Sequence, residues 1–376
     1  MPPERDLIQR IQSQVSRLVQ AVADAEFWHD RWLEQAEEEH QRQVAAAEAR
    51  YHQVIAEAQS TYGHQESAGL LSAPWHDPRW ESWVPATGGV IPPFILAGQL
   101  IEAGQWHRLT IPAIFPLAGG YNVLFKAVGG ARTTAVQAIQ SVMLRLVAMT
   151  SPGKLRFTLI DPVGLGQNVA PFMHLADYNE ALVTSRAWTE PHHIEQRLAD
   201  LTEHMETVIQ TYLRNQYATI EEYNVQAGEI AEPYRVLAVL NFPVNFSDEA
   251  ARRLVSIAQN GPRCGIYTLI TVDTEQRLPH GFNLADLERT AIVIAWDEER
   301  FVWEDDDFRD CILELDTPPD AKRFDHILSA VGEAAEQAGR VEVPFERVAP
   351  QPAQWWTEDS GDGLRVPLGP VGARRL

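Results

Sequence analysis

The stretch NVLFKAVGGARTTAVQAIQSVMLRLVAM, residues 122–149, decides the fold. It begins with a short apolar run typical of a buried β-strand and ends with a long segment whose apolar residues recur at helical spacing. Gly129 and Gly130 stand between the two and permit a tight turn. We therefore expect a strand, a short loop and a helix in direct succession, the unit from which parallel α/β sheets are built.

Further apolar runs of strand length follow, with helical segments between them. Strands are predicted at 94–101, 108–115, 122–128, 154–162, 234–242, 264–273, 290–296 and 312–316. Helices are predicted at 132–149, 194–215 and 250–259. Continuous apolar strands that alternate with helices indicate a mainly parallel sheet that helices cover on both faces. The sequence thus predicts one α/β domain over residues 92–337.

The N-terminal residues predict a different structure. Residues 4–62 contain neither Gly nor Pro, and Ala, Gln and Glu dominate them. Apolar residues recur every 3.5 residues on average, at Ile11, Val15, Leu18, Val22 and Ala25, and again at Val44, Ala47, Tyr51, Val54 and Ala58. This spacing predicts, over residues 1–64, either a coiled-coil helix or a helical hairpin that bends near residues 27–33. Residues 65–91 are rich in Pro and Gly and are expected to form a linker, although Trp75, Trp80 and Trp83 indicate that it packs on the protein.

Composition narrows the range of functions. The net charge of −21 excludes a broadly basic face for nucleic acid or for an anionic membrane. Two cysteines, Cys264 and Cys311, predict neither a disulfide framework nor a zinc site and fit a reducing cytoplasm. No run approaches about 18 apolar residues, so we expect a cytoplasmic protein without a membrane span.

The loop after the strand at 122–128 stands where P-loop nucleoside triphosphatases bind phosphate. Their motif, G-x-x-x-x-G-K-[ST], wraps a phosphate in backbone N–H groups, reaches it with Lys and holds magnesium with a hydroxyl. Here Lys126 and Ala131 replace the glycines, Arg132 replaces Lys, and Thr133 keeps the hydroxyl. The candidate site is therefore a degenerate phosphate loop, with the residues Lys126, Gly129, Gly130, Ala131, Arg132, Thr133 and Thr134.

A P-loop ATPase also needs a carboxylate after a second apolar strand, to support magnesium and to polarise water. The matching strand, VLAVL at 236–240, ends in Asn241 and Phe242. Asn241, a degenerate Walker B residue, completes the candidate site, but it carries no charge, and Phe242 cannot act as a base. Because two independent elements are altered, we expect no hydrolysis, and we assign no catalytic residue and no metal ligand.

Three further segments carry a family resemblance: FTLIDPVGLG at 157–166, the segment 205–224 ending in ATIEEYN, and NGPRCGIYTLITVD at 260–273. In this order they resemble the FtsK/SpoIIIE–HerA branch of P-loop motor ATPases. More narrowly, the chain is similar to bacterial multi-domain members in which a coiled coil precedes a degenerate first ATPase module and an intact second one. The resemblance implies a RecA-like P-loop NTPase core, and an extended tail at 338–376 that leads toward a second module.

The resemblance also implies function, cofactors and partners. It implies ATP and Mg as cofactors, weakly bound or absent in this segment, a homo-oligomer or a coiled-coil partner, and DNA reached through the full-length assembly. We expect a non-hydrolysing module that acts in the assembly or regulation of an active ATPase module. One alternative is a divergent but active DNA translocase, in which Arg132 and Asp161 or Asp273 take over the missing roles. A second is a free-standing adaptor on a dead NTPase fold.

Overall fold

The computed structural model describes residues 3–62, 69–70, 72–86, 91–103, 108–117, 120, 122–184 and 186–339. The predicted tail, 338–376, lies almost entirely outside these residues, as does Trp106. The chain divides into two compact units, Met1–His64 and Gln65–Leu376. None of the helices that the structure describes combines the length and the apolar character needed to cross a lipid bilayer.

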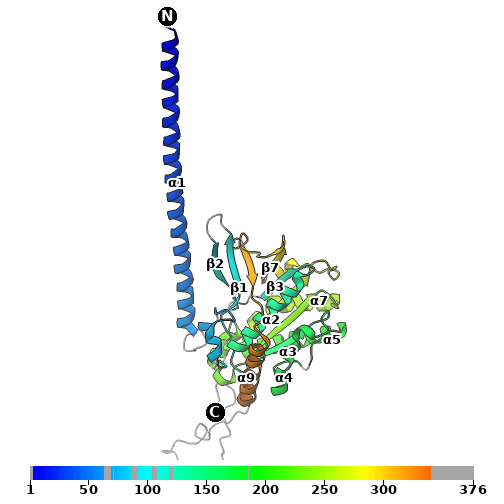
Figure 1. Ribbon diagram of the computed structural model, residues 1–376. Coiled ribbons are helices and arrows are strands. Elements are labelled where there is room, and N and C mark those ends of the chain that lie inside the picture. The colour runs from blue at the N-terminus through cyan, green and yellow to red at the C-terminus, as the bar shows by residue number, and fades with distance from the viewer. Residues whose placement is uncertain are drawn as a thin grey trace, which may run out of the picture. The chain divides into compact units, whose positions relative to one another are not determined.

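The first unit is a single helix, α1 (Pro3–Tyr62), which runs without a break for 60 residues (Figure 1). At about 1.5 Å per residue it is about 90 Å long. The prediction of a long N-terminal helix is confirmed, whereas the alternative of a hairpin is wrong, because α1 continues through residues 27–33. The side chains of Val15, Leu18 and Val22 are 52%, 66% and 57% exposed. Whether they pair with a second helix stays a prediction.

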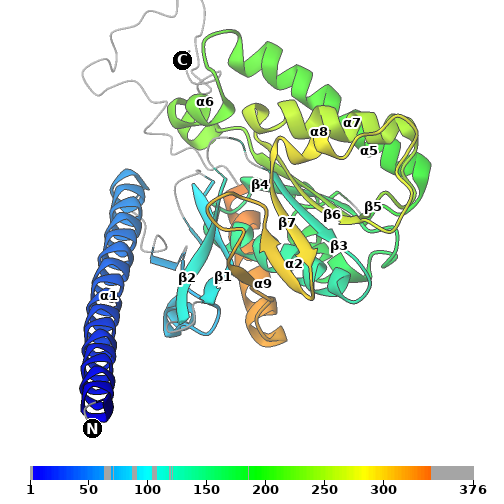
Figure 2. The same cartoon turned by 90° about the horizontal axis from the view of Figure 1, so that it is seen from above.

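The second unit is built on one nine-stranded sheet (Figure 2). Its strands are β1 (Phe94–Ala103), β2 (Arg108–Pro116), β3 (Asn122–Ala127), β4 (Leu155–Ile160), β5 (Tyr234–Phe242), β6 (Ile266–Asp273), β7 (Ala291–Asp297), β8 (Arg300–Trp303) and β9 (Ile312–Leu315). Their order across the sheet is β2-β1-β9-β8-β7-β3-β6-β5-β4. The strands β7, β3, β6, β5 and β4 are all parallel. This half confirms the predicted RecA-like α/β core.

The other half of the sheet is antiparallel, from β7 through β8, β9 and β1 to β2. The sequence indicated a mainly parallel sheet and missed β8, a strand of four residues between the acidic runs 297–299 and 304–307. At Gly98 in β1 a Cβ atom would lie 2.1 Å from the carbonyl oxygen of Glu314 in β9. Glycine therefore permits the close pairing of β1 with β9 inside the antiparallel half.

Helices cover both faces of the sheet (Figure 2). On one face lie α2 (Ala131–Met149) and α9 (Ala321–Gly339), and on the other lie α5 (Pro191–Thr207), α7 (Asp248–Asn260) and α8 (Ala285–Glu288). The predicted helix at 194–215 is divided, since a π-helix, η4 (Val208–Leu213), follows α5. The remaining helical segments are η2 (Pro78–Ser82), η3 (Gln167–Val169), α3 (Ala170–Met173), α4 (Leu175–Tyr178), α6 (Ile220–Ala227), η5 (Gly228–Ile230) and η6 (Pro262–Cys264).

The tryptophan-rich segment packs on the α/β unit, as its composition indicated. Trp75, Trp80 and Trp83 are 3–6% exposed. The guanidinium of Arg145, on α2, lies 4.2 Å from the centre of the Trp75 ring and donates to Asp316 at 2.6 Å. This buried ion pair and its aromatic cover tie the segment to α2 and to the residue that follows β9.

Candidate functional site

The candidate site lies at the edge of the sheet where the parallel strands end. The loops that follow β3, β4, β5 and β6 all leave from this edge, because parallel strands share one direction. Crevices outside the carboxyl ends of such strands are where open α/β sheets bind ligands. The structure therefore brings the loop at 128–130, Asp161, Asn241 and Asp273 to one edge.

The loop between β3 and α2 is a tight turn of three residues, 128–130. Gly129 adopts a left-handed conformation, with φ of 51°. The N–H group of Ala131 donates to the carbonyl of Val128 at 3.1 Å, and that of Thr133 donates to Gly130 at 3.2 Å. Two of the N–H groups that would face a phosphate are thus engaged inside the turn. The side chain of Thr133 is exposed, and that of Thr134 is half-buried.

Lys126, in the first glycine position of the motif, belongs to β3 and forms ion pairs away from the loop. Its Nζ lies 3.0 Å from Glu288 Oε1 and 2.6 Å from Glu304 Oε2. Burial opposes the charge, but hydrogen bonds to Glu304 and Glu288 outweigh it, so that the pKa of Lys126 is raised. Lys126 therefore stays charged and joins β3 to α8 and to the end of β8. Glu304 belongs to an exposed acidic run, 304–307.

Arg132, in the position of the P-loop lysine, is held by an internal carboxylate. Its Nη1 donates to Asp273 Oδ2 at 2.5 Å, and its Nε donates to the carbonyl of Gly129 at 3.2 Å. Asp273 ends β6, the strand next to β3, and its side chain is only 1% exposed. Asp273 therefore occupies the anion position on Arg132.

The end of β5 carries no carboxylate. Asn241 is buried in a left-handed conformation, with φ of 59°, and its N–H group donates to Thr271 Oγ1 at 2.7 Å. Phe242 is fully buried, and its ring centre lies 5.0 Å from those of Phe246 and Phe282. Phe242 is therefore part of an aromatic cluster in the core and has no role toward a ligand at the edge.

Asp161, after β4, anchors its own loop. Its Oδ1 accepts from the Gly164 N–H at 3.0 Å and from Asn168 Nδ2 at 3.1 Å. Its Oδ2 accepts from the N–H groups of Gly166 at 3.1 Å and Asn168 at 3.2 Å. Four hydrogen bonds satisfy this buried carboxylate within residues 161–168, so it has little capacity left for a metal ion or a water molecule.

These contacts decide whether the edge fits a magnesium-bound nucleotide. Two loop donors bond within the turn, Arg132 pairs with Asp273, and Asp161 is satisfied within its own loop. Asn241 supplies no charge to magnesium. Among the described residues, no three His, Cys, Asp or Glu side chains come together as a metal site. The residues in this arrangement do not fit the magnesium–triphosphate group.

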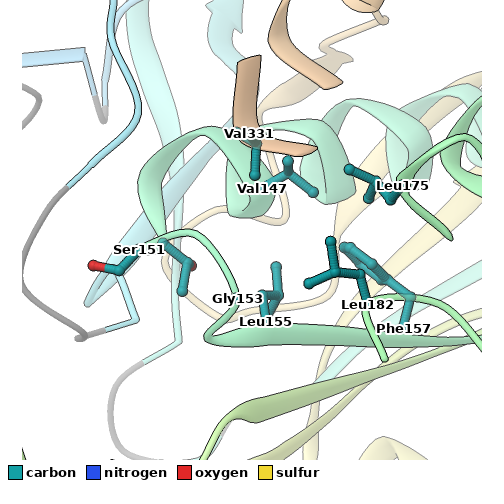
Figure 3. Close-up of a pocket in the computed structure, with 9 residues that line it drawn as sticks. Val147, Ser151, Gly153, Leu155, Phe157, Leu175, Leu182 and Val331 are labelled. Atoms are coloured by element: carbon teal, nitrogen blue, oxygen red, sulfur yellow. The ribbon is translucent and has the colours of Figure 1, made fainter. Parts of the chain in front are cut away.

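A pocket in another part of the α/β unit is not an alternative ligand-binding site. Its apolar lining includes Val147, Leu155, Phe157, Leu182 and Val331, which point toward one another from α2, β4 and α9 and from the segment after α4 (Figure 3). Its volume of about 10 Å³ holds about one water molecule. It is a packing defect between α2 and the sheet, too small for an organic ligand.

No protein-family model and no curated protein sequence matches the chain. Among solved structures, EssC (ATPases 2 and 3) from Geobacillus thermodenitrificans aligns with a TM-score of 0.50 and 14% identity, over 70% of this chain and 52% of that one. The α/β unit has the fold of an FtsK/SpoIIIE-type ATPase module. The resemblance stated from the motifs is thereby confirmed for the fold.

Two further solved structures align with the α/β unit at lower TM-scores. EccC (ATPases 2 and 3) of Thermomonospora curvata, in complex with a signal sequence peptide, aligns with a TM-score of 0.45 and 14% identity, over 68% of this chain and 54% of that one. The pCW3 conjugation coupling protein TcpA, with ATPγS, has the same TM-score and identity, over 68% and 73%. The chain spans about half the length of the EssC structure that it matches.

Sequence reasoning missed the partners of its own candidate residues. It named Asp273 as a substitute for the missing carboxylate, but not as the ion-pair partner of Arg132. It did not name Glu288 as a partner of Lys126. The sequence does place Arg132 just after one predicted strand and Asp273 at the end of another. However, only the order of the sheet, in which β3 and β6 are neighbours, brings these two residues together.

Proposed function

We propose that this chain is a non-hydrolysing module of an FtsK/HerA-type ATPase, which acts in the assembly or regulation of an active ATPase module. The observation that carries the proposal is the ion pair between Arg132 and Asp273, in which a buried carboxylate takes the side chain that would otherwise meet a nucleotide phosphate. A module of this kind keeps the shape of the ATPase fold for contacts with neighbouring modules and contributes no chemistry of its own.

The chemistry of hydrolysis has lost several parts at once. Arg132 is neutralised, Asn241 brings no charge to magnesium, and Phe242 is a core residue that cannot accept a proton. Loss of a positioned general base typically costs about 10²–10⁴-fold in rate, and loss of charge stabilisation adds to this cost. The combined effect leaves no measurable turnover.

The alternative of a divergent, active ATPase requires Asp161 or Asp273 to take over the missing roles. Both lie at the correct edge of the sheet, which is the reason to test it. However, the Asp161 carboxylate already accepts four hydrogen bonds, and Asp273 is paired with Arg132. Either residue would have to break these contacts before it could act on magnesium or water.

Helix α1 supports a role in assembly. Its exposed apolar side chains would cost free energy in water unless another helix covers them. We propose that α1 pairs with a second copy of itself or with a coiled-coil partner. Contact with DNA would then be made by the full assembly, since the chain has a net charge of −21.

A turnover assay tests the proposal. The purified chain is incubated with ATP and magnesium, with and without double-stranded DNA, and phosphate release is measured. We expect no release above the background of a heat-denatured sample. Turnover near about 1 per second that disappears in Arg132→Ala would contradict the proposal and establish the active alternative.

A further inference from the structure

A second cluster of charged side chains lies at the opposite edge of the sheet, where β4 and β5 begin. Arg156 and Arg235 are register partners in this parallel pair, so their side chains leave the same face of the sheet side by side. His204, near the end of α5, and Glu232, just before β5, lie over them, with 3.8 Å between His204 Nε2 and Glu232 Oε1. Tyr212, in the π-helix η4, hydrogen-bonds to Glu232.

The charges in this cluster do not balance. Glu232 is the one carboxylate that the described residues place in contact with it, and it lies 4.0 Å from Arg235 Nη2. Burial lowers the pKa of Arg235, and the neighbouring Arg156 lowers it further. Burial, Arg235 and Arg156 also lower the pKa of His204 to about 4, so this ring is neutral at pH 7. Two guanidinium groups therefore share a single, distant carboxylate in a chain whose net charge is −21.

The cluster also holds buried nitrogen atoms without partners. Nε of Arg156, Nε of Arg235 and Nε2 of His204 have no hydrogen-bond partner among the described residues. Such atoms are rare in native proteins, and each one calls for an explanation. Three in one cluster, two of them on cations, indicate that an acceptor belongs there.

The cluster is reachable from solvent. The side chains of Arg235, His204 and Glu232 are 23%, 14% and 15% exposed. Its walls include η4, and π-helices occur frequently at functional sites. The turn after η4 continues through Arg214 and Asn215, both in left-handed conformations with φ of 43° and 58°. Partly buried donors under an irregular, well-defined segment fit a small ligand better than a broad protein surface.

We propose that Arg156, Arg235 and His204 form a binding site for a small oxyanion of the phosphate type. A guanidinium group binds two phosphate or carboxylate oxygens through two parallel N–H bonds. One guanidinium therefore occupies both oxygens of a carboxylate, whereas a tetrahedral anion still has oxygens for a second guanidinium. Two guanidiniums side by side, with a ring nitrogen above them, present donors in several directions. The site lies at the opposite edge of the sheet from the loop at 128–130. A test of this site is therefore independent of a test of the proposed function.

The test is calorimetric titration of the full chain with sodium phosphate, against sodium chloride and sodium acetate at equal ionic strength. We expect phosphate binding that acetate does not reproduce. Arg156→Gln and Arg235→Gln should each weaken it about tenfold or more, since each removes charge-assisted hydrogen bonds. Arg235→Lys keeps the positive charge but loses the planar pair of N–H donors, so it should weaken binding by less than Arg235→Gln does.

A matched variant locates the site. Arg252→Gln removes an exposed cation of α7 that pairs with Glu249, and it should change the phosphate affinity less than about twofold. The proposal is overturned if the wild-type chain shows no phosphate binding, if acetate binds equally well, or if Arg156→Gln and Arg235→Gln both keep the wild-type affinity. Equal loss in Arg252→Gln would indicate an adventitious ion only.

Discussion

Arg132, in the first turn of α2, donates across 2.5 Å to the buried carboxylate of Asp273, the last residue of β6. The two residues are 141 positions apart in the chain. In this pair Asp273 holds the guanidinium that stands in the position of the P-loop lysine. The contact therefore links the altered chemistry of the loop to the stability of the sheet.

Loss of Arg132 should destabilise the fold. Among the described residues, Arg132→Ala leaves the buried Asp273 carboxylate with the N–H group of Glu275 as its one hydrogen-bond partner. We expect the free energy of unfolding to fall by about 1–3 kcal/mol. Urea denaturation followed by circular dichroism measures this change. Arg252→Ala, at an exposed ion pair, is the control and should change stability by less than about 0.5 kcal/mol. An unchanged free energy of unfolding in Arg132→Ala would show that the ion pair contributes nothing to the stability of the fold.

The missing base cannot be restored by a single substitution. Phe242→Glu places a carboxylate among Phe246 and Phe282, and we expect a loss of about 4 kcal/mol or more, or a chain that does not fold. Phe242→Leu keeps an apolar side chain there and should cost about 1–2 kcal/mol. Near-ultraviolet circular dichroism and urea midpoints distinguish the two. A stable, well-packed Phe242→Glu would mean that the position is open to solvent and that Phe242 is not a core residue.

Acid should destabilise the protein through His204. The pKa of this ring is about 4 in the folded chain, against an ordinary value of 6.5, because it is buried and faces Arg235 and Arg156. Between these two values the unfolded chain binds more protons than the folded chain, so stability rises with pH and falls as pH drops from about 6.5 to about 4. Glu232 and Tyr212 also lie beside His204, and both residues are the same in the wild type and in the His204→Gln variant.

The measurement compares urea midpoints of the wild type and His204→Gln across this pH range. We expect the variant to lose less stability on acidification, with a difference in slope of at most about 1.4 kcal/mol per pH unit. His280→Gln, at an exposed histidine, is the matched control and should follow the wild type. Parallel pH profiles for His204→Gln and the wild type would show that His204 titrates normally.

Helix α1 should determine the oligomeric state. The triple substitution Val15→Ser, Leu18→Ser and Val22→Ser removes three exposed apolar side chains of α1 and introduces neither Gly nor Pro. We expect a lower molar mass by light scattering than for the wild type, because burial of apolar area drives helix pairing. Arg17→Ser with Gln20→Ser changes the opposite side of the helix and should leave the mass unchanged. Equal molar masses for all three proteins would show that Val15, Leu18 and Val22 have no role in assembly.

Several features of the protein could be derived from the order of residues alone. Apolar spacing in α1 and in β3, β4, β5 and β6 is local, so it identified the long helix and the parallel strands before any contact was known. The residue types in the two motifs were equally visible: Arg132 in place of Lys, and Asn241 with Phe242 in place of an acidic pair. A local pattern suffices for these features because secondary structure and side-chain chemistry depend on near neighbours in the chain.

The tertiary structure decided which of these residues meet. Strand β6 lies between β3 and β5, and this order places Asp273 on Arg132 and Thr271 under Asn241. The antiparallel half of the sheet depends on β8, which its pairing with β7 reveals, and on Gly98, which is needed only because β9 lies beside it. Arg156 and Arg235 become a pair only through the register of β4 and β5. These contacts join residues far apart in the chain, and their free energy depends on distance and burial, which one-dimensional spacing does not contain.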